Sequence, residues 1–130
     1  DERRELLNAI TAVSEDRIVV VASRNISDIE YLSDEVILME KGCLIRKARI
    51  SELTEEISSF IYEISVPEEM IPELKKRYCI AQMTYAGTGV KVRLLSENPP
   101  WKFDFSPVVP TLNDVYLYHF QMKEKGWNQA

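Results

Sequence analysis

The polar side chains of Ser23, Arg24 and Asn25 follow a short apolar run, Ile18–Ala22. A guanidinium group can bind a phosphate through two parallel hydrogen bonds, and hydroxyl and amide groups can add further bonds to the same anion. Arginine stays protonated in proteins and therefore cannot accept a proton. Arg24 could therefore bind a phosphate but could not act as a base, and the alternative of equal weight is that it is a solvated loop residue.

The other reactive side chains form no catalytic pattern. His119 is the only histidine, and no Ser, Cys or Asp is placed to form a nucleophile pair with it. Gly87 and Gly89 lack the third glycine and the following helix of a phosphate-binding loop, so they predict a hairpin turn. Cys43 and Cys79 are too few for a metal site, and we expect two free thiols. A stand-alone enzyme therefore has little support.

The elements around the polar loop follow from the spacing of apolar residues. Glu2–Val13 carries leucine, isoleucine and valine at helical spacing, which predicts an amphipathic helix. The almost wholly apolar run Ile18–Ala22 is typical of a strand covered on both faces, as in a parallel sheet. Ser27 and Glu30 have the spacing of a capping box, which predicts a short helix over Asp28–Leu32.

A hairpin and a short helix should come next. Val36–Met39 and Cys43–Arg49 are the predicted strands, and Gly42 can adopt the positive φ that a two-residue turn requires. Ser51 is the predicted cap of a short helix that runs toward Ile57.

The second half alternates strands with helices. The period-two pattern predicts strands over Phe60–Val66, Ile80–Tyr85 and Val90–Leu94, and an edge strand over Trp101–Phe105. Helical spacing of apolar residues predicts a helix that begins at Glu68. Thr111 and Asp114 form a second capping box, for a last helix that runs to about Lys125 and stops at Gly126.

Composition limits the function classes. The 130 residues are 45% hydrophobic and carry a net charge of −5, which favours a packed core and argues against nucleic-acid binding. Residues 1–56 hold 13 acidic and 8 basic residues, whereas residues 57–130 hold 8 of each, which predicts a domain boundary near Glu56. No run approaches the ~20 apolar residues of a membrane span, so we expect a soluble chain whose membrane role requires a partner.

Two blocks of this sequence resemble ATP-binding subunits of ABC transporters. The stretch from Ile18 to Ile45 is similar to the region around the switch-histidine loop, including the hairpin Asp-Glu-Val-Ile-Leu-Met-Glu-Lys-Gly, and Ala22-Ser23-Arg24 lies where that family has Ser-Thr-His. The stretch from Pro110 to Tyr118 resembles the Pro-Ser-Leu-Glu-Asp-Val-Phe-Leu-like ending of exporter-type subunits. The phosphate loop ending in Gly-Lys-Ser/Thr and the Leu-Ser-Gly-Gly-Gln-like signature do not occur in these residues.

The resemblance implies an architecture. Residues 1–56 are expected to be the C-terminal portion of an α/β ATP-binding domain, and residues 57–130 a small α+β accessory domain. It also implies ATP and Mg²⁺ in the intact subunit, with Arg24 catalytic at the switch-histidine position and Ser23 and Asn25 near the γ-phosphate. For this chain alone we expect no cofactor, no metal and no ATPase activity.

The implied partners are a transmembrane permease subunit and a second ATP-binding subunit in a homodimer. The expected location is the cytoplasm, peripheral on the inner face of the cell membrane. The alternative is a non-catalytic regulatory or dimerisation module. In either case the apolar run Ile18–Ala22 lacks neighbouring strands, which predicts self-association of the isolated chain.

Overall fold

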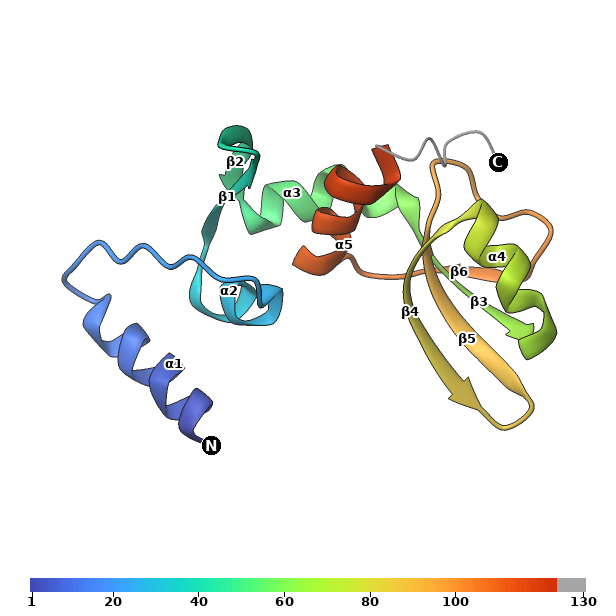
Figure 1. The fold of residues 1–130 in the computed structure, drawn as a ribbon, viewed down its shortest axis with the longest axis horizontal. Helices are drawn as coiled ribbons and strands as arrows, with labels where there is room; N and C mark the ends of the chain where they lie inside the picture. Colours follow the sequence, from blue (N-terminus) through green and yellow to red (C-terminus); the bar gives the residue numbers. More distant parts are fainter. Residues whose placement is uncertain (124–130) are drawn as a thin grey trace. The chain divides into compact units, whose positions relative to one another are not determined.

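The computed structural model describes residues 1–123, and the chain divides into two compact units after Ser51 (Figure 1). The fold class is α+β, with one two-stranded and one four-stranded sheet, both antiparallel. The sequence places the boundary after Glu56. The parallel strand expected in the first unit is not formed.

The first unit contains two helices followed by a hairpin. Its elements are α1 (Glu2–Val13), α2 (Ile26–Leu32), β1 (Glu35–Glu40) and β2 (Cys43–Arg49). Helix α1 and strand β2 have the bounds that the sequence predicts. Within residues 1–51 only Val36 and Ala48 are buried, and these two residues are directly paired across the hairpin.

The turn between β1 and β2 confirms the sequence prediction. Lys41 has φ 50° and Gly42 has φ 78°, so both central residues are in the left-handed region. Two-residue turns of this kind match the twist of the strands that they join. The hairpin closes at Glu40 and Cys43, and its first residue, Glu35, pairs with Arg49.

The strand predicted over Ile18–Ala22 is wrong for this chain. The segment is irregular, and no backbone hydrogen bond joins residues 18–22 to any described residue. The side chains of Ile18 and Val20 are 96% and 89% exposed. A strand forms only against a neighbouring strand that accepts its backbone hydrogen bonds, and no described residue supplies one.

Two predicted helix caps are also wrong. The N-cap of α2 is Asn25, whose side-chain oxygen accepts from the backbone N–H of Asp28, so Ser27 lies inside the helix. Asn25 has the extended backbone that a cap requires, with φ −87° and ψ 100°. Helix α3 (Ile50–Glu56) likewise begins before Ser51. Because each helix starts earlier than expected, the predicted cap falls in its first turn.

The second unit surrounds the four-stranded sheet, whose strand order is β4-β5-β3-β6. Its strands are β3 (Ile61–Pro67), β4 (Cys79–Ala86), β5 (Gly89–Leu95) and β6 (Phe105–Pro107). Its helices after α3 are α4 (Ile71–Arg77) and α5 (Leu112–Leu117). Short 3₁₀ turns precede β3 at Ser58–Phe60 and α4 at Glu68–Met70, and a π-helical turn at Tyr118–Met122 follows α5.

The main core lies between this sheet and α4. Alternate residues of β3 and β5 pair across the strands and are buried, as the period-two pattern predicts. Helix α4 adds two buried residues, Ile71 and Leu74. The core cluster consists of Tyr62, Ile64, Val66, Ile71, Leu74, Val90, Val92 and Leu94.

Three predictions for the second half need correction or fall outside the described residues. The helix expected from Glu68 begins at Ile71, after a 3₁₀ turn. The edge strand expected over Trp101–Phe105 is confined to Phe105–Pro107, because the carbonyls of two prolines accept from Trp101 and Phe103 and turn the chain there. The predicted helix stop at Gly126 lies outside the described residues.

A buried ion pair joins strand β5 to the start of α5. Arg93 donates from Nε to Asp114 Oδ1 at 3.2 Å and from Nη2 to Asp114 Oδ2 at 2.5 Å, and Nη2 also donates to the Val109 carbonyl at 2.6 Å. The Asp114 carboxylate accepts from Thr111 N as well, which completes the predicted capping box. The Asp114 side chain is 1% exposed, so its charge depends on these partners.

We expect Arg93→Ala to lower the free energy of unfolding by about 3 kcal/mol, because it leaves a buried carboxylate without its cation. Lys91→Ala is the matched control on the same strand, since Lys91 and its partner Glu63 are both more than a third exposed. That change should cost less than about 1 kcal/mol. Urea unfolding measures both, and equal losses would contradict the structural role of the buried pair.

The surroundings of Tyr118 shift the pKa of its hydroxyl group. Burial raises the pKa of its hydroxyl above the ordinary 10.0, and the carboxylates of Glu97 and Glu56 raise this pKa further. Its ring stacks on Phe60, with centroids 5.6 Å apart, and Lys123 Nζ lies 5.0 Å from the Tyr118 ring centroid. The folded state therefore favours the neutral phenol.

A raised pKa of Tyr118 predicts a loss of stability at alkaline pH. The stabilisation of the folded state by the neutral Tyr118 is fully present below the unfolded pKa near 10.0, and it is lost as pH rises through the higher folded pKa. Tyr118→Phe keeps the stacked ring and removes the ionisable group, so its unfolding free energy should fall less above pH 10 than that of the unmodified chain. Identical pH profiles for the two proteins would refute this assignment.

Candidate functional site

The predicted phosphate-binding loop immediately precedes helix α2. Arg24 is exposed and makes no hydrogen bond or ion pair with any described residue. Ser23 Oγ accepts from Asn25 N at 2.9 Å, and Asn25 Oδ1 accepts from Asp28 N at 3.4 Å. Ser23 and Asn25 thus shape the turn and start the helix, whereas the guanidinium of Arg24 is available to an external anion.

Side-chain hydrogen bonds join α2 to α1. Arg3 donates from Nε and Nη2 to the same oxygen of Asp28, at 2.9 Å and 2.5 Å. Further along, Tyr31 Oη donates to Asn8 Oδ1 at 3.3 Å. These contacts lie near the surface, where water and salt weaken them, so they orient α2 more than they stabilise it.

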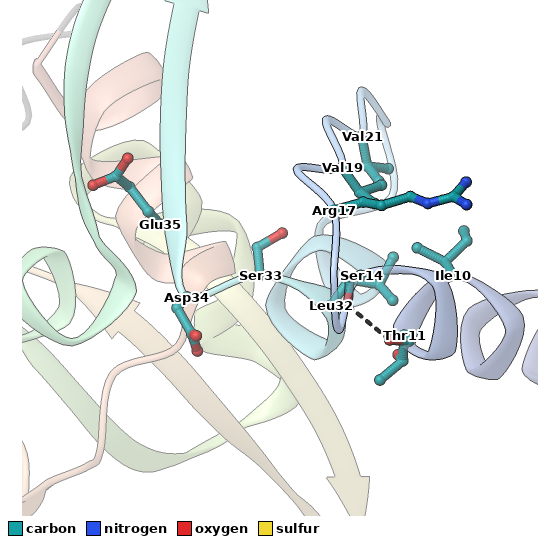
Figure 2. Close-up of a pocket in the computed structure, with 10 residues that line it drawn as sticks. All are labelled: Ile10, Thr11, Ser14, Arg17, Val19, Val21, Leu32, Ser33, Asp34 and Glu35. Carbon is teal, nitrogen blue, oxygen red and sulfur yellow. Dashed lines mark hydrogen bonds between the residues drawn. The ribbon is translucent and has the colours of Figure 1, made fainter.

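A cavity of about 240 Å³ lies beside the same part of the chain (Figure 2). Its walls come from the end of α1, the irregular segment, the end of α2 and the start of β1. The lining residues are Ile10, Thr11, Ser14, Arg17, Val19, Val21, Leu32, Ser33, Asp34 and Glu35. Ser23, Arg24 and Asn25 are not among them, so the structure does not join the predicted loop to this cavity.

The charged groups of the cavity do not converge on a common point. In Figure 2 the Arg17 guanidinium extends along the α1 side, away from the carboxylates of Asp34 and Glu35. Ser14 Oγ already donates to the Thr11 carbonyl at 2.7 Å. Among residues 1–123 no group of His, Cys, Asp and Glu side chains is arranged to hold a metal ion.

The cavity combines four apolar side chains with an exposed lining that is mainly polar. Ile10, Val19, Val21 and Leu32 face a space that their neighbours do not fill. The volume is below the ~300–1,000 Å³ of typical small-molecule pockets. Because none of its lining residues is buried, we interpret it as an open hollow at the surface of the first unit.

Sequence reasoning missed two features of the second unit. The capping box points to Asp114 as a structural residue. Its partner Arg93 lies 21 residues away in the sequence, and only the fold brings the two together. A second, smaller cavity of about 200 Å³ is lined by Met70, Glu73, Leu74, Arg77, Lys102 and Phe103. In that cavity Arg77 is already paired with Glu73 at 2.9 Å.

Comparisons with protein-family models, with curated proteins and with solved structures found no match. No helix within residues 1–123 combines the length and the apolar character needed to cross a membrane. The loop around Arg24 is the candidate site because Arg24 is exposed and makes no hydrogen bond or ion pair with any described residue.

The exposed apolar segment predicts self-association of the chain. Replacing Ile18 and Val20 together by Asn should lower the average mass in sedimentation equilibrium, because it removes exposed apolar surface through which two molecules can associate. Unfolding free energy should change little, since both side chains are almost fully exposed.

Val109→Asn is the control for this prediction. Val109 is 84% exposed but isolated from other exposed apolar side chains along the sequence, so its replacement should leave the mass unchanged. An unmodified chain that sediments as a clean monomer of 15.1 kDa at micromolar concentration would contradict the prediction.

Proposed function

We propose that this chain is the C-terminal part of an ATP-binding subunit of an ABC transporter of the exporter type. The observation that carries the proposal is the apolar segment Ile18–Ala22, which has the pattern of a buried strand but has no strand beside it among residues 1–123. A domain that supplied the missing neighbouring strands would cover this segment on both faces, as in a parallel sheet.

The small core of the first unit supports the same proposal. Neither α1 nor α2 contains a buried residue, although α1 has a clear apolar face. Helices of α/β domains bury such a face against a parallel sheet. The unfilled cavity beside Val19 and Val21 is consistent with a sheet that belongs to another part of the protein.

Arg24 is the residue that we propose for phosphate binding. It follows the apolar segment and precedes α2, the place of the switch histidine in the family that the sequence resembles. Its free guanidinium can stabilise charge on the phosphoryl oxygens, which is the main contribution that proteins make to phosphoryl transfer. Since arginine cannot accept a proton, we propose slow hydrolysis of ATP by the intact subunit.

The rest of the proposal follows from the resemblance. ATP and Mg²⁺ would be bound by the phosphate loop of the intact subunit, with Ser23 and Asn25 near the γ-phosphate. A second ATP-binding subunit and a transmembrane permease subunit would be the partners, and the complex would lie on the inner face of the cell membrane. Residues 57–130 would form the accessory domain.

Arg24→His in the intact subunit is the decisive variant. We expect kcat for ATP hydrolysis to rise at least about tenfold, because a positioned general base contributes about 10²–10⁴-fold and arginine cannot serve as one. Arg24→Ala should instead lower kcat, since it removes the charge. Arg17→Ala is a control at a nearby exposed arginine and should leave kcat unchanged.

The coding sequence upstream of Asp1 gives the first and simplest test. A Gly-x-x-x-x-Gly-Lys-Ser/Thr loop after a predicted strand, followed by a signature motif, would support the proposal. A start codon at this point or an unrelated domain would overturn it in favour of a non-catalytic regulatory or dimerisation module. An unchanged kcat in Arg24→His would refute the role of Arg24 alone.

A further inference from the structure

The smaller cavity of the second unit lies between α4 and the loop that joins β5 to β6 (Figure 1). Leu74 of α4 forms part of its lining and is 2% exposed, so the cavity reaches down to the core. Met70 and Phe103 also line it and pack half-buried against the core cluster. The remaining lining residues, Glu73, Arg77 and Lys102, are exposed. The cavity therefore has an apolar floor and a charged rim.

The loop side of this cavity is held in place by its own backbone. Trp101 N donates to the Pro99 carbonyl at 2.8 Å, and Phe103 N donates to the Pro100 carbonyl at 2.9 Å. Both acceptors are prolines, whose φ is fixed by the ring, and Pro100 is buried. The two sides of the cavity are thus formed without a ligand, so binding requires little ordering of the chain.

The charges at the rim favour an anion. Arg77 Nη2 lies 2.9 Å from Glu73 Oε1, so the charges of these two residues offset each other. Lys102 makes no hydrogen bond or ion pair with any described residue. Asp104, the nearest acid to Lys102 in the loop sequence, does not line the cavity. The rim therefore carries one uncompensated positive charge, and the Arg77 guanidinium has further donors for the same anion.

We propose that this cavity binds a small aromatic carboxylate, with its ring against Met70 and Phe103 and its carboxylate at Lys102 and Arg77. Aromatic rings pack well on phenylalanine, and the methionine sulfur makes favourable contacts with ring edges. The volume of about 200 Å³ is below the ~300–1,000 Å³ of typical small-molecule pockets, which limits the ligand to about one ring. This inference does not depend on the proposed transporter function.

Phenylacetate is the probe for this proposal, and phenylacetamide is its neutral control. Each is titrated into the full chain, and backbone amide shifts are followed by NMR. We expect phenylacetate to bind with a Kd of about 1–10 mM, as its small size allows, and to shift the amides of residues 70–77 and 101–104. Phenylacetamide keeps the ring but lacks the charge, so its affinity should be at least about threefold weaker, the loss of an exposed ion pair.

Charge variants at the rim test the same contact from the side of the protein. Lys102→Gln should weaken phenylacetate binding at least about threefold, whereas Glu73→Gln should strengthen it, because it removes an acid and frees Arg77. Lys75→Gln is the matched control, since Lys75 is exposed on the same helix but does not line the cavity. Its Kd should change less than about twofold, because solvent and salt screen the more distant charge.

Circular dichroism confirms that each variant is folded, which we expect because all three replaced residues are exposed. Equal affinities for phenylacetate and phenylacetamide would overturn the proposal, as would equal losses in Lys102→Gln and Lys75→Gln. A parent chain that shows no saturable shifts with phenylacetate, or shifts confined to residues away from the cavity, would overturn it as well.

Discussion

The fold of this chain depends on where apolar side chains find a surface to cover them. In the second unit the sheet and α4 enclose a core cluster in which Val92 and Leu94 are fully buried. In the first unit burial is limited to Val36 and Ala48, and the valine-rich segment before α2 remains in solvent. Because apolar burial is the main favourable contribution to folding, the two units differ in how far each can stabilise itself.

Within the second unit, one carboxylate connects the sheet to its last helix. Asp114 accepts hydrogen bonds from Arg93 on β5 and from Thr111 at the start of α5, and it is almost completely buried. A buried charge is tolerated only when its hydrogen-bonding capacity is filled. The position of α5 against the sheet is therefore coupled to the side chain of a strand residue, which turns a local capping motif into a tertiary contact.

The candidate loop in the first unit uses its residues in two ways. Asn25 and Ser23 satisfy backbone groups and begin α2, while Arg24 makes no bond to a described residue. An arginine held on an ordered turn but left without a partner is suited to an anion from outside the chain. Two other surfaces have no partner among the described residues. One is formed by the exposed apolar side chains of the segment before Arg24, and the other by the backbone groups along the uncharged edge of β4.

The sequence by itself determined the elements whose stabilisation is local. Helix α1, the hairpin turn at Lys41 and Gly42, the alternating strands and the Thr111–Asp114 capping box depend on near neighbours in the chain, and their patterns predicted them. Only the tertiary structure decided that Ile18–Ala22 is not a strand, that Asn25 caps α2, and that Arg93 reaches Asp114. The missing strand and the Arg93–Asp114 pair depend on groups that are distant in the sequence, and local residue patterns do not show which distant groups the fold brings together. The choice of Asn25 over Ser27 as the cap is local, and depends on the residue at which the backbone enters the helix.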